Sequence, residues 1–211
     1  MNFLAHLWLT DRAQLPLAGA ILGDVLRGAL PEQMPEPLAQ SVRLHRQVDA
    51  QTDRHPRVVA ARATFDPGAR RYAGIVLDLL FDHVLAQDWA SYSTQALPDF
   101  ADRAAQEVHR GQAWFEQAGQ PVPQPAPFSA LLQSYASGPG IQRAIERTAR
   151  RLRQPQAMID AASGWESRLA RLRRDLPLLL SDLRSPETGG PGLQGGVDQS
   201  LMGPLSAGTH S

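Results

Sequence analysis

The apolar residues of this chain recur at helical spacing, and this periodicity constrains its fold more than any other feature. In the clearest example, five leucines spaced three or four residues apart share one face of a helix, at Leu169, Leu172, Leu176, Leu179 and Leu183. Helical patterns are predicted over 2–9, 18–26, 38–51, 58–65, 72–89, 98–117, 141–152 and 159–183. The sequence has no alternating pattern of the length that a half-buried strand needs. We therefore predict an all-α fold, an irregular helical bundle.

Length and composition predict one helical domain followed by a tail. The 211 residues correspond to about one domain, since domains usually hold roughly 100–200 residues. Between 185 and 211, 10 of 27 residues are Gly or Pro, and the only charged residues are Glu187 and Asp198. Such a segment cannot bury enough apolar surface to offset its ordering entropy. We expect a domain over 1–184, and a disordered tail over 185–211 with no catalytic role.

The residue types that the chain lacks exclude several kinds of site. It has no Cys, which excludes a disulfide framework, a thiolate zinc site and a Cys nucleophile. It has no Lys, which excludes a Schiff base and the lysine of a phosphate-binding P-loop. The 21 basic residues balance 21 acidic ones, so no global field favours nucleic acid or an anionic membrane. A metal would have to be held by His, Asp or Glu.

We also expect neither a membrane span nor a signal peptide. Apolar runs stay well short of the roughly 18–20 residues of a membrane span, and residues 1–6 lack the charged region of a signal peptide. We therefore expect a cytoplasmic protein that binds neither nucleic acid nor membrane.

Histidine and aspartate residues gather in the first 83 positions at spacings that suit a metal centre. If the helix extends far enough, His45, Asp49 and Asp53 share one face, and Asp78 and Asp82 form a second i, i+4 pair. The second pair lies in strongly apolar sequence, and buried carboxylates need a cation, a proton or hydrogen-bond donors. A divalent metal held by His nitrogen and Asp oxygen, with positions left for water and a phosphate oxygen, meets that need.

Each of these elements also has a simpler interpretation. His6 is equally consistent with a core or capping histidine, and Asp24 with a helix cap or a partner of Arg27. His45 and Asp49 are also consistent with a surface hydrogen bond worth a few tenths of a kcal/mol. The carboxylate pair in the apolar helix is harder to explain in this way, because like charges at i, i+4 are destabilising unless something neutralises them.

Four sequence blocks, taken in order, resemble the acyl carrier protein phosphodiesterase family: NFLAHL at 2–7, LGDVLRG at 22–28, HRQVD at 45–49 and LDLLFDH at 77–83. The resemblance covers residues 1–89 well, and extends more loosely to about 183. This family is regarded as a distant relative of the HD-domain phosphohydrolases, which are helical enzymes with a His and Asp metal centre. The resemblance therefore implies an HD-domain-like fold and hydrolysis of the phosphodiester between a carrier serine and 4'-phosphopantetheine. The implied metal is manganese.

The resemblance also implies roles for individual residues. The implied metal ligands are His6, Asp24, His45 and Asp82. The residues expected to complete the ligand set, orient the attacking water or protonate the leaving serine oxygen are Asp49, Asp78 and His83. Phosphate binding is expected from Arg27 and Arg46. The order at positions 82 and 83 is Asp-His, whereas HD enzymes have His-Asp.

The implied partner, holo acyl carrier protein, is acidic, and basic stretches are candidates for its docking. Between 43 and 71 seven arginines stand against three acids, and between 143 and 174 nine stand against three. Either stretch is also consistent with a solvated helical face. Two other functions remain open: a metal enzyme acting on a nucleotide or other small phosphoester, and a non-catalytic helical protein that binds the carrier without metal or turnover.

Overall fold

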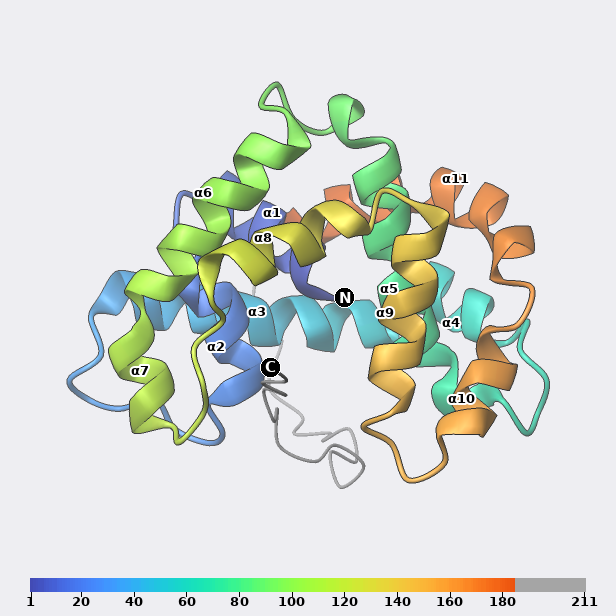
Figure 1. Ribbon diagram of the computed structural model, residues 1–211, viewed down its shortest axis with the longest axis horizontal. Coiled ribbons are helices and arrows are strands. Elements are labelled where there is room, and N and C mark those ends of the chain that lie inside the picture. The colour runs from blue at the N-terminus through green and yellow to red at the C-terminus, as the bar shows by residue number, and fades with distance from the viewer. Residues whose placement is uncertain (185–211) are drawn as a thin grey trace.

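The computed structural model describes residues 1–184, and every regular element within that part of the chain is a helix (Figure 1). There are eleven α-helices and two short 3-10 helices in this range. The all-α prediction is confirmed. The predicted disordered tail, 185–211, lies outside the described residues. Within them, no helix is both long enough and apolar enough to cross a membrane.

The first half of the chain forms α1 (Phe3–Arg12), α2 (Ala18–Val25), α3 (Glu36–Arg54), α4 (Pro56–Arg62) and α5 (Arg70–Gln87). These helices follow the predicted periodic segments to within a few residues. Proline sets the boundary between α3 and α4. A residue before proline avoids the helical region, so α3 ends at Arg54 and His55 is extended. Pro56 then opens α4.

The second half forms η1 (Trp89–Ser91), α6 (Leu97–Arg110), α7 (Gln112–Gln117), α8 (Pro125–Ser134), α9 (Gly138–Ala149), α10 (Pro155–Ala162), η2 (Trp165–Arg168) and α11 (Leu169–Arg184).

Three predictions for this half were wrong in detail. The single helix predicted over 98–117 is divided at Gly111, which caps α6 and precedes α7. The helix predicted over 159–183 is interrupted at Gly164, whose φ of 65° is a left-handed conformation that glycine adopts without strain. No helix was predicted between 117 and 141, where α8 lies and starts with proline in its first turn.

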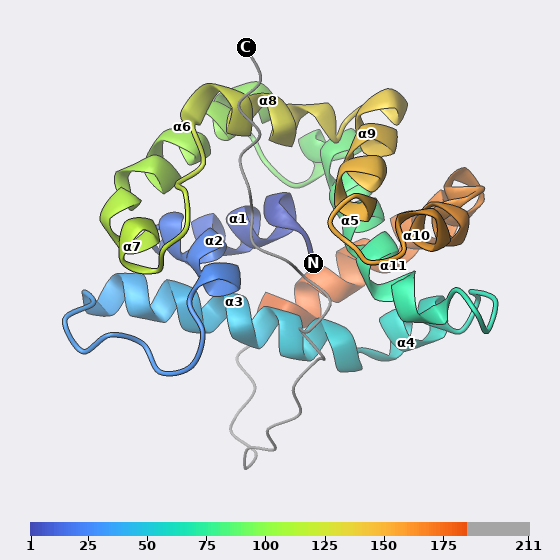
Figure 2. The same ribbon diagram turned by 60° about the horizontal axis from the view of Figure 1, so that its bottom comes forward.

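Helix α5 lies in the interior and positions the rest of the fold. It packs against α1, α4, α9, α10 and α11, and most of its side chains are buried. In the turned view, α3 lies along one side and α8 along the opposite side, with α5 and α9 at one end and α2, α6 and α7 at the other (Figure 2). The N-terminus lies in the middle of this arrangement in both views. The residues predicted to carry chemistry therefore come from helices that meet near the centre.

Candidate metal centre

Two histidines from different helices stack face to face in the interior. His6 on α1 and His45 on α3 have ring centroids 3.9 Å apart and an interplanar angle of 23°, and both residues are almost completely buried. His6 lies on the side of α1 that faces α3. The contact between them joins positions 39 residues apart in sequence.

The hydrogen bonds of His45 direct one ring nitrogen toward carboxylates. Its Nδ1 lies 2.7 Å from the carbonyl oxygen of Ala20, so Nδ1–H donates to that oxygen. Its Nε2 lies 3.1 Å from Oδ2 of Asp49 and 3.3 Å from Oδ1 of Asp24. A backbone acceptor on one nitrogen is the usual way in which a metal-binding histidine is oriented through the other.

Asp49 joins the two rings through its two oxygens. One oxygen accepts from Nε2 of His6 at 2.9 Å, and the other faces Nε2 of His45. The Asp49 side chain is 40% exposed, so the group has one side open to solvent. The ligand atoms of His6, His45 and Asp49 all lie within 4.8 Å of one another.

The electrostatics of this group favour a positive charge between the rings and the carboxylates. Burial alone would lower the pKa of His45, but its contacts with Asp24 and Asp49 raise it to about 9. Burial and the charge of His45 lower the pKa of His6 to about 4. Burial would raise the pKa of Asp49, but its hydrogen bonds with the two histidines hold it well below the usual range. At neutral pH His45 therefore carries a positive charge and His6 is neutral, and both rings lie beside an ionised carboxylate.

The amino group of Met1 is a second positive charge drawn to the same carboxylates. It is buried, and lies 3.4 Å from Oδ1 of Asp49 and 3.2 Å from Oδ1 of Asp78. Burial alone would lower the pKa of this amino group, but Asp78 and Asp49 raise it to about 10. A proton and an ammonium group therefore balance the charge of the carboxylates here.

These residues fit a divalent metal ion. Two imidazole nitrogens and one carboxylate oxygen form a donor set that suits first-row transition metals. The carboxylate of Asp24 supplies another oxygen on the exposed side. A metal binds histidine through an unprotonated nitrogen, so it would displace the protons that Nε2 of His6 and Nε2 of His45 direct at the carboxylates.

A close backbone approach holds His45 in place. A Cβ atom built on Gly23 would lie 2.2 Å from Cγ and Cδ2 of His45, and one built on Gly19 would lie 2.2 Å from Oγ of Ser41. Helix α2 can therefore pack its backbone directly against α3 only because both positions lack a side chain. This packing brings Ala20 and Asp24 to the imidazole.

A family model for acyl carrier protein phosphodiesterase matches residues 1–183. The chain belongs to this family. A protein of that name from Enterobacter sp. is 39% identical over 109 residues, which cover 51% of this chain and 56% of the relative. The relative from Photorhabdus laumondii is also 39% identical over 109 residues, 51% of this chain and 55% of its own length. One from Escherichia coli K12 is 41% identical over 100 residues, 47% and 50% respectively. The chain thus spans about half the length of the curated relatives it matches, and no solved structure matches it.

In this member of the acyl carrier protein phosphodiesterase family, Asp82 is not among the clustered ligand atoms. Its two oxygens accept hydrogen bonds from the backbone N–H groups of Leu4, at 2.7 Å, and Ala5, at 3.0 Å. Burial raises the pKa of Asp82 to about 7, although these two hydrogen bonds lower it. We predicted that buried carboxylates need a cation, a proton or donors, and here the first turn of α1 provides the donors. In this structure Asp82 therefore caps the first turn of α1, and its role as a metal ligand stays a prediction.

Asp78 shares the face of α5 that carries Asp82, as their spacing predicted. It is 34% exposed on its side chain and lies beside the amino group of Met1. Burial raises the pKa of Asp78, against the opposing charge of that amino group. Asp78 thus reaches the edge of the cluster through Met1, whereas Asp82 is enclosed behind it.

The structure places His83 away from the candidate metal centre. It follows Asp82 by one residue, about 100° around the helix. Its Nδ1 lies 2.5 Å from the carbonyl oxygen of Tyr135, and its ring packs edge-on against Trp165 with centroids 5.1 Å apart. Its Nε2 is buried with no hydrogen-bond partner among the described residues. His83 thus lies outside the group of His6, His45 and Asp49, and its catalytic role stays a prediction.

The two predicted phosphate-binding arginines differ in their contacts. Arg46 donates to the carbonyl oxygens of Leu26, at 2.7 Å, and Gly28, at 2.8 Å, and so holds the segment that follows α2. Arg27 lies on that segment and is exposed. The structure thus assigns Arg46 a structural contact and leaves Arg27 accessible at the edge of the site.

One contact at the start of α1 was not predicted from the sequence. The side-chain amide of Asn2 donates to the hydroxyl of Tyr135 at 2.7 Å, which ties the start of α1 to the segment between α8 and α9. Asn2 falls within the first family block, but nothing in the sequence marks its partner 133 residues away.

Proposed function

We propose that this chain is a metal-dependent phosphodiesterase that hydrolyses the bond between 4'-phosphopantetheine and a serine of holo acyl carrier protein. The products would be the apo carrier and 4'-phosphopantetheine. The observation that carries the proposal is the group of His6, His45 and Asp49 atoms within 4.8 Å of one another, in a chain of this family. The relatives it matches are named acyl carrier protein phosphodiesterases.

In this proposal His6, His45 and Asp49 hold the metal, and Asp24 lies close enough to His45 to join them. We expect manganese because the family resemblance implies it, and the nitrogen and carboxylate donors of this group suit a divalent first-row metal. A divalent cation bound here would lower the pKa of a water molecule and neutralise charge on the phosphate oxygens.

The proposed reaction requires a proton for the serine oxygen that leaves phosphorus. Asp78 is the candidate, because its partly exposed side chain lies at the edge of the group and burial raises its pKa against the opposing charge of the Met1 amino group. Asp49 has a strongly lowered pKa and stays ionised, so it can orient water as an acceptor but cannot supply a proton. The two carboxylates therefore take different roles.

Substrate phosphate would be held by Arg27, with Arg46 fixing the segment that carries it. The distribution of charge does not single out one docking surface for the carrier protein. Of the arginines between 43 and 71, Arg43 pairs with Glu36, and Arg57 with Asp175. Such pairing reduces the positive field of this stretch, so we do not assign docking to it as a whole.

The test is incubation of the purified full chain with holo acyl carrier protein and Mn²⁺, followed by mass spectrometry of the carrier. We expect the carrier to lose the mass of phosphopantetheine. In His45→Ala the rate should fall more than about 100-fold, since even the outer partners of metal ligands cost 10–100-fold when removed. His109→Ala is the matched control, because this histidine lies outside the group of clustered ligand atoms and bonds the carbonyl oxygen of Pro123, and its rate should be unchanged.

Three results would count against the proposal. A carrier of unchanged mass would favour a carrier-binding protein without turnover. Hydrolysis of small phosphodiesters alone would favour the small-phosphoester function. Full activity of metal-free protein, or of His45→Ala, would remove the metal centre from the reaction.

A further inference from the structure

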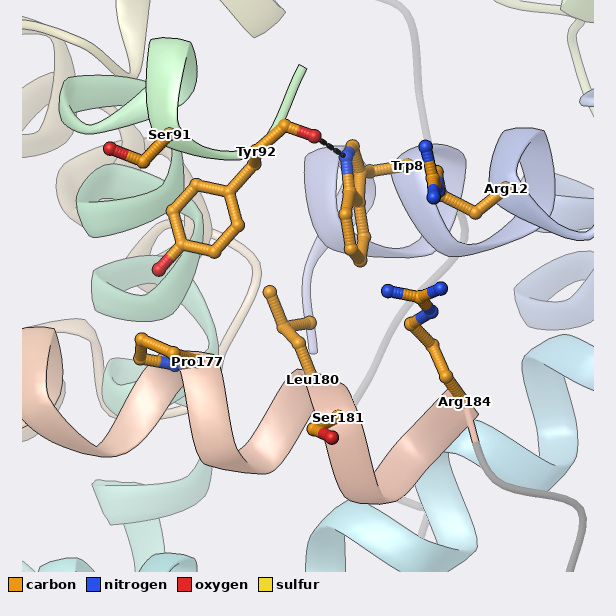
Figure 3. A pocket seen from close by; sticks show the side chains of 8 residues that line it. All are labelled: Trp8, Arg12, Ser91, Tyr92, Pro177, Leu180, Ser181 and Arg184. Atoms are coloured by element: carbon orange, nitrogen blue, oxygen red, sulfur yellow. Dashed lines mark hydrogen bonds between the residues drawn. The ribbon is translucent and has the colours of Figure 1, made fainter.

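A second site is suggested by a pocket between α1 and α11, away from the candidate metal centre. Its volume is about 320 Å³, within the usual range for small-molecule sites. Figure 3 shows the side chains that line it: Trp8, Arg12, Ser91, Tyr92, Pro177, Leu180, Ser181 and Arg184. Trp8 follows His6 by two residues, about 200° around α1, so the two side chains point to different sides of the helix.

Two arginines from different helices converge on this pocket. Arg12 ends α1 and Arg184 ends α11, and their guanidinium groups face each other across it (Figure 3). Neither has an acidic partner within ion-pair distance among residues 1–184. The acids beside them in sequence are engaged elsewhere: Asp11 accepts two hydrogen bonds, at 2.8 and 3.0 Å, from an arginine of α6, and Asp182 lies 3.1 Å from His55.

Two positive charges that face each other without a counter-charge repel, and an anion between them removes that repulsion. Each guanidinium presents N–H groups in a planar fork that matches phosphate or carboxylate oxygens. Two such groups balance the double charge of a phosphate monoester better than the single charge of a carboxylate. The arginine pair therefore favours a phosphate group.

The aromatic side chains complete the pocket with a fixed apolar wall. The indole N–H of Trp8 donates to the carbonyl oxygen of Tyr92 at 3.2 Å, and the two rings meet edge to face with centroids 6.0 Å apart. The guanidinium carbon of Arg184 lies 5.9 Å from the Trp8 ring. In Figure 3 both arginines lie on one side of the indole and Tyr92 on the other, above Pro177 and Leu180. The pocket thus has a cationic part and an apolar part.

We propose that this pocket binds a small organic phosphate monoester. Arg12 and Arg184 hold its phosphate, and the surfaces of Trp8, Tyr92 and Leu180 contact its organic part. The proposal does not depend on the function assigned to the metal centre.

The test is isothermal titration of the full-length protein with phenyl phosphate, in the presence of EDTA and at slightly alkaline pH, where the probe is a dianion. We expect one site per chain, with inorganic phosphate and phenol each binding at least about tenfold more weakly, since each lacks one half of the contacts. Arg12→Gln and Arg184→Gln should each weaken binding about tenfold, about 1.4 kcal/mol. Arg174→Gln is the matched control, because it removes the same charge from an exposed position of α11 outside the pocket, and binding should be retained.

Repeating the titration with His45→Ala separates this site from the metal centre. Binding that survives this substitution, while carrier hydrolysis is lost, would support two independent sites. Binding that disappears with His45→Ala would place the probe at the metal centre and overturn the proposal. The proposal would also be overturned by an absence of saturable binding, or by equal losses in Arg174→Gln and the two pocket variants, since these would indicate unspecific attraction to positive charge.

Discussion

Replacing Asp82 distinguishes its capping role from a role as metal ligand. Its carboxylate is fully buried and accepts the backbone N–H groups of Leu4 and Ala5. A hydrogen bond to a charged group contributes about 1.5–3 kcal/mol, and a buried donor left without a partner costs about 1–3 kcal/mol. Asp82→Ala removes both acceptors, so we expect the free energy of unfolding to fall by about 3–5 kcal/mol. Asp82→Asn keeps one oxygen acceptor and should lose about 1–3 kcal/mol.

The assay has two readouts on the same samples: urea unfolding followed by circular dichroism, and the manganese bound per folded chain. Capping by Asp82 predicts that Asp82→Asn loses stability yet keeps its manganese. Asp160→Asn, an exposed carboxylate on α10, should change neither quantity. If Asp82→Asn keeps its stability but loses its manganese, the carboxylate is a ligand and the capping argument fails.

Three further predictions follow from the packing and charges at the centre. Gly23→Ala should destabilise the fold by at least about 1–3 kcal/mol, because its Cβ would lie 2.2 Å from the His45 ring. The control, Gly68→Ala, has open space around it and should change stability in thermal melts by no more than about 0.5 kcal/mol. Equal effects of the two substitutions would contradict the close packing. The pKa of His6 is about 4 in the fold against 6.5 for a free histidine, so the stability that this residue contributes is present above pH 6.5 and is lost as the pH falls toward 4. In His6→Gln, unfolding measured across this interval should lack that loss, and an unchanged slope would refute it. His83→Gln should bind as much manganese as the unsubstituted chain by elemental analysis, because its ring lies outside the cluster, and a metal-free variant would restore His83 to the site.

The sequence was sufficient to predict the helices that carry the site. Apolar periodicity located α1, α3 and α5, and the i, i+4 spacing of His45 and Asp49 correctly put their side chains on one face of α3. Such features depend on local geometry, which a single sequence expresses directly. Breaks at Gly111 and Gly164 were missed because an isolated glycine is tolerated inside a helical pattern, and only the surrounding packing decides whether the helix ends there.

Partners distant in sequence could not be predicted in the same way. The pattern at Asp78 and Asp82 correctly indicated buried carboxylates that need compensation, but it did not reveal what compensates them. The structure supplies two backbone N–H groups for one and the amino group of Met1 for the other. The stacking of His6 on His45 likewise depends on how α1 crosses α3, which is a property of tertiary packing.

The bond between Asn2 and Tyr135 has a consequence for anyone who wishes to transplant this centre into another scaffold. The clustered residues His6, His45 and Asp49 all fall within the first fifty positions, so a short excerpt looks sufficient on paper. Yet the opening residue of the first family block is anchored by a phenol from the far half of the polypeptide. A graft that copied only the early helices would carry the ligands but leave the beginning of α1 without its tether.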